Sequence, residues 1–349
     1  MATRDGRWVV SADGSVPARA WIIGLPKAEV HLHLEGSIPA EILAAAAARH
    51  GSAAPAGVRD GHARVTSLAD LLSYLDWSCA LVDRAEDLSL IAHALSVRAG
   101  ESGTRHLDII VNPTHWGRWR HDLAGMIDAL DAGFARAEAE GHATAGLCVS
   151  LARRQSAAQA DELVDELLGL ARPRVVALSI DGDEGGGSHN DRFAGAFARA
   201  GAAGLRRCAH AGESSGPVGV REALDLLGAE RIDHGIRCVE EPALVDDLAR
   251  RGIPLDICPT SNVVLGVAAD LATHPLEHLR RRGVRLSLNT DDPLLYGIDL
   301  AGEYERCAAA FGWDADVLAT LARTSIESCF APPARRAALL DEWRAFTGG

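Results

Sequence analysis

Short apolar runs recur along this chain, separated by longer segments with a different periodicity. Eight runs are strand-like, and they occupy residues 28–34, 105–111, 144–151, 175–181, 205–211, 231–235, 254–259 and 285–290. The segments between them, such as 160–171, 219–228 and 241–251, are rich in Ala, Leu, Arg and Glu at helical spacing. Strands that alternate with helices in this way predict βαβ units and a parallel sheet.

Eight such units predict closure into a (β/α)8 barrel, a TIM barrel of the α/β class. No Pro/Ser-rich linker or long charge run divides the chain, so we expect one domain over residues 1–349, with 1–22 as an N-terminal extension. Residues 35–104, between the first two strands, are too many for one crossover helix. Their pattern predicts a helical insertion that overhangs the barrel mouth as a lid.

Composition narrows the possible functions. The formal net charge of −13 disfavours a broad phosphate-binding surface, so we expect no nucleic-acid partner. Seven scattered cysteines without a C-x-x-C pair argue against a disulfide framework and an all-cysteine zinc site. No apolar run approaches the ~18 residues of a membrane helix, and the first 14 residues lack a signal-like core, so we expect a cytoplasmic protein without membrane contact. The pattern makes no prediction of oligomeric state.

Polar residues gather where the predicted strands end. His31 and His33 lie two apart on the first strand and therefore point to the same face. His210 closes the fifth strand, and Asp291 and Asp292 close the eighth. Adjacent buried carboxylates repel, and one stays protonated unless a cation is near. Three histidines and one carboxylate suit a zinc ion with an open position, where a water molecule is activated as a nucleophile.

Two further residues have competing interpretations. His234 closes the sixth strand, where an isolated histidine is most often packed in the core. Because the other polar strand ends converge on one mouth, we interpret His234 as part of the site. Trp77, in the predicted insertion, is either a stacking partner for a base or part of the lid core.

Taken together, these motifs resemble the adenosine/adenine deaminase family of the amidohydrolase superfamily. The matching segments are LPKAEVHLHLEGS (25–37), HAGE (210–213), DHG (233–235), CPTSNVVLG (258–266), SLNTDDP (287–293) and ARTSIESCF (322–330). The similarity therefore runs from about residue 25 to 330. It implies one zinc ion per chain, and the implied ligands are His31, His33, His210 and Asp291.

The resemblance also implies roles in hydrolytic deamination of a 6-aminopurine. His234 would orient and deprotonate the attacking water, and Glu213 would protonate ring nitrogen N1. Asp292 would hydrogen-bond N7, and the Gly182 backbone would contact N3. The chemistry agrees, because protonating N1 during attack at C6 lowers the barrier. That step needs a carboxylic acid still protonated near pH 7, which burial can provide.

The substrate expected first is a nucleoside, adenosine or deoxyadenosine, because CPTSN (258–262) and NTDDP (289–293) resemble the nucleoside branch. Glu35 points elsewhere, since the nucleoside branch typically has there an Asp that meets the ribose. Glu35 therefore favours the alternative, a deaminase of adenine, aminodeoxyfutalosine or another amino-heterocycle. A non-catalytic protein that retains the metal site is a third interpretation.

The second strand departs from the family pattern. Relatives usually place a Glu and an Arg two apart there, whereas this chain has Asp108 and Ile110, followed by Asn112. The loss of the Arg is expected to alter packing or charge below the pocket. His189, in the segment 182–193, has no counterpart in the family pattern.

Overall fold

The computed structural model describes residues 17–53, 58–59, 62–63, 67–185 and 190–348. The first part of the predicted N-terminal extension and His189 therefore lie outside the described residues. The described part of the extension continues into a short helix that precedes the first strand, α1 (Arg19–Gly24).

Eight parallel strands form the centre of the molecule, in the order β1-β4-β5-β6-β7-β8-β9-β10. They are β1 (Lys27–His33), β4 (Thr104–Val111), β5 (Thr144–Ala152), β6 (Val175–Asp181), β7 (Arg206–Ala211), β8 (Arg231–His234), β9 (Pro254–Ile257) and β10 (Arg285–Leu288). Each lies within or overlaps one predicted run, so the predicted (β/α)8 barrel is confirmed. The last three strands end one or two residues before their predicted ends, where the chain turns into the loops that carry the site.

The first and last strands approach each other and nearly close the barrel. Leu32 of β1 forms an isolated parallel bridge with Asp291, which follows β10. The amide of His33 donates to the carbonyl of Asp291 over 2.7 Å. This closure brings together the polar residues at the end of β1 and those that follow β10, which are about 260 residues apart in the sequence.

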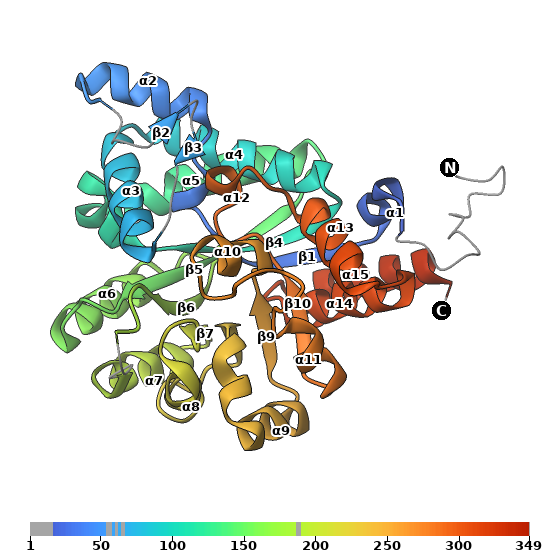
Figure 1. Ribbon diagram of the computed structural model, residues 1–349. Helices are drawn as coiled ribbons and strands as arrows, with labels where there is room; N and C mark the ends of the chain where they lie inside the picture. The colour runs from blue at the N-terminus through green and yellow to red at the C-terminus, as the bar shows by residue number, and fades with distance from the viewer. Residues whose placement is uncertain (1–16, 54–57, 60–61, 64–66, 186–189, 349) are drawn as a thin grey trace.

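Helices surround the barrel, as Figure 1 shows. Those after the first are α2 (Ala40–His50), α3 (Leu68–Leu81), α4 (Ala85–Glu101), α5 (Leu123–Ala139), α6 (Ala157–Leu170), α7 (Ala194–Ala202), α8 (Gly216–Asp225), α9 (Pro242–Arg251), α10 (Pro259–Val264), α11 (Leu276–Arg281), α12 (Pro293–Tyr296), α13 (Leu300–Phe311), α14 (Ala315–Ser328) and α15 (Pro333–Thr347). All seven residues of β1 are buried, as expected for a parallel strand covered on both faces. Within the described residues, no helix is long and apolar enough to cross a membrane.

The segment between β1 and β4 contains more than a crossover helix. It begins with the 3-10 turn η1 (Glu35–Ser37), then α2, a short hairpin of β2 (Val58–Arg59) and β3 (His62–Ala63), and finally α3 and α4. Helix α4 packs along α5 and β4 in the outer helical layer. Helix α3 instead contacts η1 and the 3-10 turns after β4. Within this segment, η1 and α3 carry residues that line a cavity at the strand ends. A lid over the whole of residues 35–104 stays a prediction.

Candidate active site

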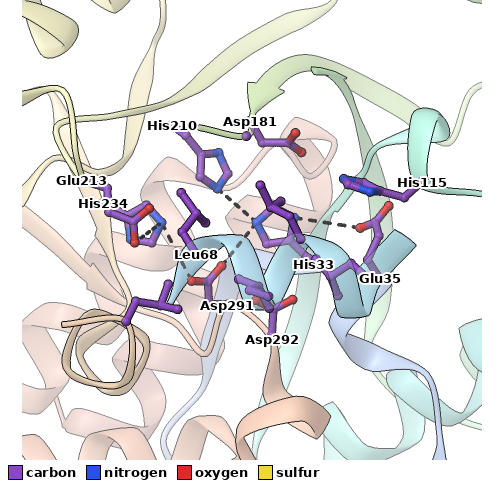
Figure 2. Close-up of a pocket in the computed structure, with 15 residues that line it drawn as sticks. His33, Glu35, Leu68, His115, Asp181, His210, Glu213, His234, Asp291 and Asp292 are labelled. Atoms are coloured by element: carbon purple, nitrogen blue, oxygen red, sulfur yellow. Dashed lines mark hydrogen bonds and ion pairs between the residues drawn. The ribbon is translucent and has the colours of Figure 1, made fainter. Parts of the chain in front are cut away.

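Three imidazoles and one carboxylate meet at the carboxyl end of the barrel, and Figure 2 shows most of this group. The Nε2 atom of His210 lies 3.1 Å from Nε2 of His31 and 3.0 Å from Nε2 of His33. Asp291 Oδ1 lies 3.3 Å from Nε2 of both His31 and His33. The four residues are at most 8% exposed. The structure therefore brings together all four predicted metal ligands.

This arrangement fits a single metal ion. Donors at about 2.0–2.1 Å from a tetrahedral zinc ion lie about 3.3 Å apart, close to the spacings found here. Without a metal ion, the histidines of the cluster would bind protons with very different affinities. Burial lowers the pKa of His33, but Asp291 raises it to well above its ordinary value. Burial and the neighbouring imidazoles hold the pKa of His210 well below its ordinary value. A second possible set shares two of these ligands and adds His234 and Cys258.

Strained backbone lets consecutive residues face one cavity. Successive side chains of a strand point to opposite faces. His234 and Asp291 both have φ of +66°, a conformation that non-glycine residues rarely adopt. His234 lines the cavity, whereas the preceding Asp233 is buried beside Nδ1 of His210. At the turn of Asp291, both Asp291 and Asp292 line the cavity. Strain of this kind is concentrated at functional sites.

The ring nitrogens that face away from the cluster lie close to oxygen atoms. His31 Nδ1 lies 2.9 Å from the backbone carbonyl of Asp256. His210 pairs in register with Asp233 on the neighbouring strand, and its Nδ1 lies 3.5 Å from Asp233 Oδ2. Asp233 is fully buried. A carboxylate on the outer nitrogen of a metal-binding histidine fixes the ring and makes it a stronger ligand.

Two carboxyl groups beside the cluster are suited to donate protons. Burial, with the nearby charges of Asp291 and Glu184, raises the pKa of Glu213 to about 8. Burial and the adjacent Asp291 also raise the pKa of Asp292 to about 8. Both groups line the same cavity as His33, His210 and Asp291 of the possible metal-binding cluster. At neutral pH each is an acid that can donate a hydrogen bond.

The loop that carries Glu213 is held by another carboxylate. Glu184 accepts hydrogen bonds from the amides of Gly212, Glu213 and Ser215 at 2.8–3.1 Å. Glu184 is 3% exposed, so these bonds form away from water. Several amide donors on one buried carboxylate make a rigid turn. The structure thus fixes the position of the Glu213 backbone.

A second polar wall of the cavity is built around Glu35, and Figure 2 places it beside His115. Glu35 Oε1 accepts from the amide of Asn112 and from Nε1 of Trp116, each over 2.7 Å. Its Oε2 is buried and has no hydrogen-bond partner in the structure. Asn112 also donates to Asp181, another cavity residue. The atypical Asn112 of the second strand therefore braces two acidic residues of the cavity.

The opposite side of the cavity is apolar. Its lining includes Leu265 and four leucines of α3, namely Leu68, Leu71, Leu72 and Leu75. These four follow the helical repeat i, i+3, i+4, i+7, so they form one stripe that faces the strand ends. Trp77 is not among the lining residues. Its Nε1 donates to Ser52 over 3.1 Å, and its ring lies 5.7 Å from that of Tyr74.

Some lining residues were predicted and others were not. Gly182, whose backbone is predicted to contact N3, lines the cavity with φ of +89°, a conformation that favours glycine. His115 and Asp181 were not singled out from the sequence. His115 lies in the 3-10 turn η2 (Pro113–His115), and its Nδ1 is 2.6 Å from Asp76. Asp181 ends β6, and a polar residue at a strand end is a signal that the sequence offered.

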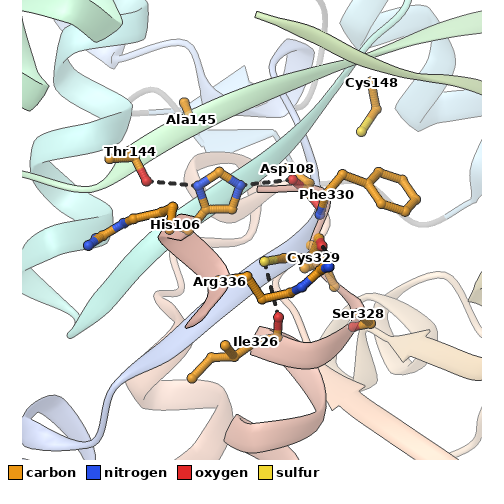
Figure 3. A network of polar contacts seen from close by, with 12 residues as sticks. His106, Asp108, Thr144, Ala145, Cys148, Ile326, Ser328, Cys329, Phe330 and Arg336 are labelled. Carbon is orange, nitrogen blue, oxygen red and sulfur yellow. Dashed lines mark hydrogen bonds and ion pairs between the residues drawn. The ribbon is translucent and has the colours of Figure 1, made fainter. Parts of the chain in front are cut away.

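Below the cavity, Asp108 occupies the place where the family pattern is broken. It accepts from His106 over 3.0 Å and from the amide of Phe330 over 2.8 Å, and Figure 3 shows this network. Arg231 of β8 supplies the cation, 2.6 Å from Asp108 and 2.9 Å from Asp256. Ile110 packs in an apolar cluster with Phe330. The positive charge beneath the pocket therefore comes from the sixth barrel strand rather than from position 110.

Comparison with known sequences places this site in a family. A sequence model of the adenosine deaminase family matches residues 26–345. A protein named adenine deaminase from Sphingopyxis alaskensis is 37% identical over 93% of this chain and 96% of its own length. A protein named aminodeoxyfutalosine deaminase from Streptomyces coelicolor is 33% identical, covering 96% of this chain and 88% of its own length.

Solved structures agree with this assignment. Adenine deaminase from Arthrobacter aurescens superposes with a TM-score of 0.85 at 33% identity, covering 93% of this chain and 100% of its own. An amidohydrolase from Burkholderia ambifaria, with bound zinc, gives a TM-score of 0.84 at 27% identity and covers 99% and 97%. With the metal-binding cluster and the buried acids on one cavity, these matches lead to one conclusion. The chain belongs to the adenosine deaminase family and is a deaminase.

Proposed function

We propose that this protein hydrolyses the 6-amino group of adenine, giving hypoxanthine and ammonia, with one zinc ion held by His31, His33, His210 and Asp291. One observation carries the proposal: two buried carboxylic acids line the same cavity as His33, His210 and Asp291, three of the four members of the cluster. A purine ring offers acceptor nitrogens at N1, N3 and N7, and the cavity offers donors to match them.

The mechanism assigns each donor a nitrogen. When bound, zinc supplies an activated water molecule as the nucleophile. Glu213, still protonated near neutral pH, donates its proton to N1 and makes C6 electrophilic. Asp292 donates to N7, and the Gly182 amide donates to N3. The two protons of the water end on the amino group, which leaves as ammonia, and on Glu213, which regains its acid form as the aromatic ring is restored.

Glu35 favours a free base over a nucleoside. Its Oε1 is occupied by two donors, while Oε2 is buried, has no hydrogen-bond partner and lies 3.9 Å from Nδ1 of His33. Adenine has an N9–H that can donate to this oxygen, whereas the N9 of a nucleoside carries ribose instead of hydrogen. The names of the relatives also support adenine rather than adenosine. The nucleoside expected first from the sequence is therefore replaced by its alternative.

Aminodeoxyfutalosine is the second candidate substrate. The observation in its favour is the relative of that name from Streptomyces coelicolor, which matches 96% of this chain. This substrate is an N9-substituted adenine. It would therefore leave Glu35 Oε2 without the N9–H donor. A contact between Glu35 and N9 is thus expected with adenine and not with aminodeoxyfutalosine.

The test is a substrate comparison with zinc-loaded protein. Ammonia release is measured with adenine, adenosine, 2′-deoxyadenosine and aminodeoxyfutalosine at equal concentrations. We expect kcat/KM for adenine to exceed that for each N9-substituted compound by at least about 100-fold, the scale on which a site rejects a substrate that lacks its hydrogen bond. Higher activity with any N9-substituted compound would overturn the choice of adenine.

A variant at Glu35 tests the reason for this preference. Glu35→Ala should lower kcat/KM for adenine by about 10- to 100-fold, the usual effect of losing a hydrogen bond to a charged group. The exposed Glu41, six residues away, provides the control, and Glu41→Ala should leave the activity unchanged. An unaltered kcat/KM in Glu35→Ala would remove Glu35 from substrate recognition.

A further inference from the structure

Behind the catalytic pocket, three hydrogen bonds connect His234 to the protein backbone. The amide of Leu276 lies 3.1 Å from Nδ1 of His274. Nε2 of His274 lies 3.2 Å from Oδ1 of Asn262, and Nδ2 of Asn262 lies 3.2 Å from Nδ1 of His234. The side chains of the two histidines and Asn262 are at most 3% exposed, so water does not compete for these bonds.

The direction of each bond follows from its first donor. A backbone N–H can only donate, so Nδ1 of His274 accepts and carries no proton. The proton of that ring is on Nε2, which donates to the carbonyl oxygen of Asn262. The amide nitrogen of Asn262 can only donate, so Nδ1 of His234 accepts in turn. The remaining proton of His234 must then be on Nε2, the atom that faces the pocket.

We propose that Asn262 and His274 are positioning residues that hold His234 in the tautomer with the proton on Nε2, so that His234 meets the reactants as a hydrogen-bond donor. The acceptors around Nε2 fit this role, since it lies 3.6 Å from Glu213 Oε1 and 3.8 Å from Asp291 Oδ2. Burial also lowers the pKa of His274 to about 4, which keeps that ring neutral.

The reverse tautomer would need a coupled rearrangement. For Nε2 of His234 to lose its proton, Nδ1 must gain one, and Asn262 must turn its oxygen toward it. Nε2 of His274 would then have to accept, which moves the proton of that ring to Nδ1. The buried amide of Leu276 would be left facing a donor, and such an unsatisfied group is costly. The backbone amide of Leu276 therefore fixes the direction of all three hydrogen bonds.

The same carboxamide reaches the acid of the reaction. Nδ2 of Asn262 also lies 3.4 Å from Glu213 Oε1, so this oxygen is an acceptor. The proton of the Glu213 acid is thereby assigned to Oε2. His234 retains its expected role of orienting the attacking water, as a donor to the oxygen. In this tautomer it cannot accept the proton of that water at Nε2. These catalytic consequences rest on the proposed function, whereas the tautomer does not.

Nitrogen NMR of protein labelled with ¹⁵N-histidine tests the tautomer directly, without any substrate. Spectra of the metal-free and the zinc-loaded protein are compared, and the His234 signals are assigned by their loss in His234→Gln. We expect an unprotonated Nδ1 and a protonated Nε2 in both forms. A proton on Nδ1 of His234 in either form would overturn the proposal.

Substitution of Asn262 tests whether it sets the tautomer. In Asn262→Asp the side chain can only accept, so His234 should switch to the tautomer with the proton on Nδ1. Ser261→Ala is the matched control, because Ser261 lies on the same helix and bonds Tyr296 instead. It should leave the His234 signals unchanged. An unchanged tautomer in Asn262→Asp would show that Asn262 does not set it.

Kinetics separate positioning from a structural role. With adenine, Asn262→Asp should lower kcat on the order of 100-fold, the loss typical of one preorganised donor, while KM changes little. His274→Phe, which frees the Asn262 amide to turn, should give a mixture of both tautomers and a smaller loss of kcat. If a variant lost both kcat and thermal stability while His234 kept the wild-type tautomer, the substituted residue would have only a structural role, and the proposal would be wrong. Inactivity of the wild type with adenine would count against the proposed function alone.

Discussion

We predict that Asp233→Asn weakens metal binding although Asp233 is not itself a metal ligand. Asp233 Oδ2 lies 3.5 Å from Nδ1 of His210, on the side of the ring away from the ion. Two full charges at that distance interact by about 5 kcal/mol at an effective dielectric of about 20. The ring carries only part of the charge of the ion, so the effect is smaller. Loss of such a partner typically weakens metal affinity about 10- to 100-fold, or about 1.4–2.7 kcal/mol.

The assay is a competition for zinc between the metal-free protein and a chromophoric chelator, which gives Kd independently of activity. The matched control is Asp108→Asn, which removes another fully buried carboxylate of the barrel. Asp108 contacts Arg231 and His106 but no member of the metal-binding cluster among its described partners. The control should therefore keep Kd within about 3-fold. An equal Kd in Asp233→Asn and the wild type would refute the assigned role of Asp233.

Three further outcomes follow from the buried charges. Glu213→Gln should lower kcat for adenine by about 10²- to 10⁴-fold while zinc content, measured by metal analysis, stays at the wild-type value; a loss of zinc would mean that the residue acts through the metal. Because Glu213 must be protonated to act and its pKa is about 8, kcat/KM of the wild type should fall as pH rises above about 8, and a pH profile flat to pH 10 would contradict this role. Arg231→Met leaves two buried carboxylates unpaired and should cost about 3–5 kcal/mol in urea unfolding. Arg19→Met, which removes ion pairs whose Arg side chain is 42% exposed, should cost at most about 1 kcal/mol, and similar costs for both would contradict the ranking.

The barrel and its metal ligands could be predicted because their signals are local in the sequence. Each strand is a short apolar run, and the polar residue that ends it is adjacent to that run. The spacing of His31 and His33 alone predicts that both side chains lie on the same face of the strand. The convergence of His210 and Asp291 on that pair then follows from barrel closure, which Figure 1 shows as one ring of strands.

The rest of the site depends on contacts that the sequence does not display. Trp77 was considered as a stacking residue, but α3 turns its leucine stripe, from Leu68 to Leu75, toward the cavity. Trp77 lies two residues beyond the stripe, about 200° around the helix from Leu75. The leucine spacing was a usable signal for that face. The substrate preference required a Glu35 Oε2 without a hydrogen-bond partner, which follows only from the contacts of Glu35 with its neighbours Asn112 and Trp116.

The positioning of His234 was equally hidden. Asn262 lies within a recognised segment, but its partner His274 lies outside any motif. Their contact depends on how the loop after α10 folds back. The strained φ at His234 and Asp291 is also invisible in the sequence, since neither residue is a glycine. The sequence therefore identifies the residue types of the site, whereas the tertiary structure determines where each side chain points and which of its atoms donates or accepts.

The most direct test of the account is a zinc titration of metal-free protein, with adenine deamination measured after each addition. Activity should rise in proportion to added zinc and reach its maximum at one ion per chain, with ammonia and hypoxanthine formed in equal amounts. His210→Ala should abolish both zinc binding and activity. Full activity without metal, or saturation at two ions per chain, would contradict a single ion held by His31, His33, His210 and Asp291.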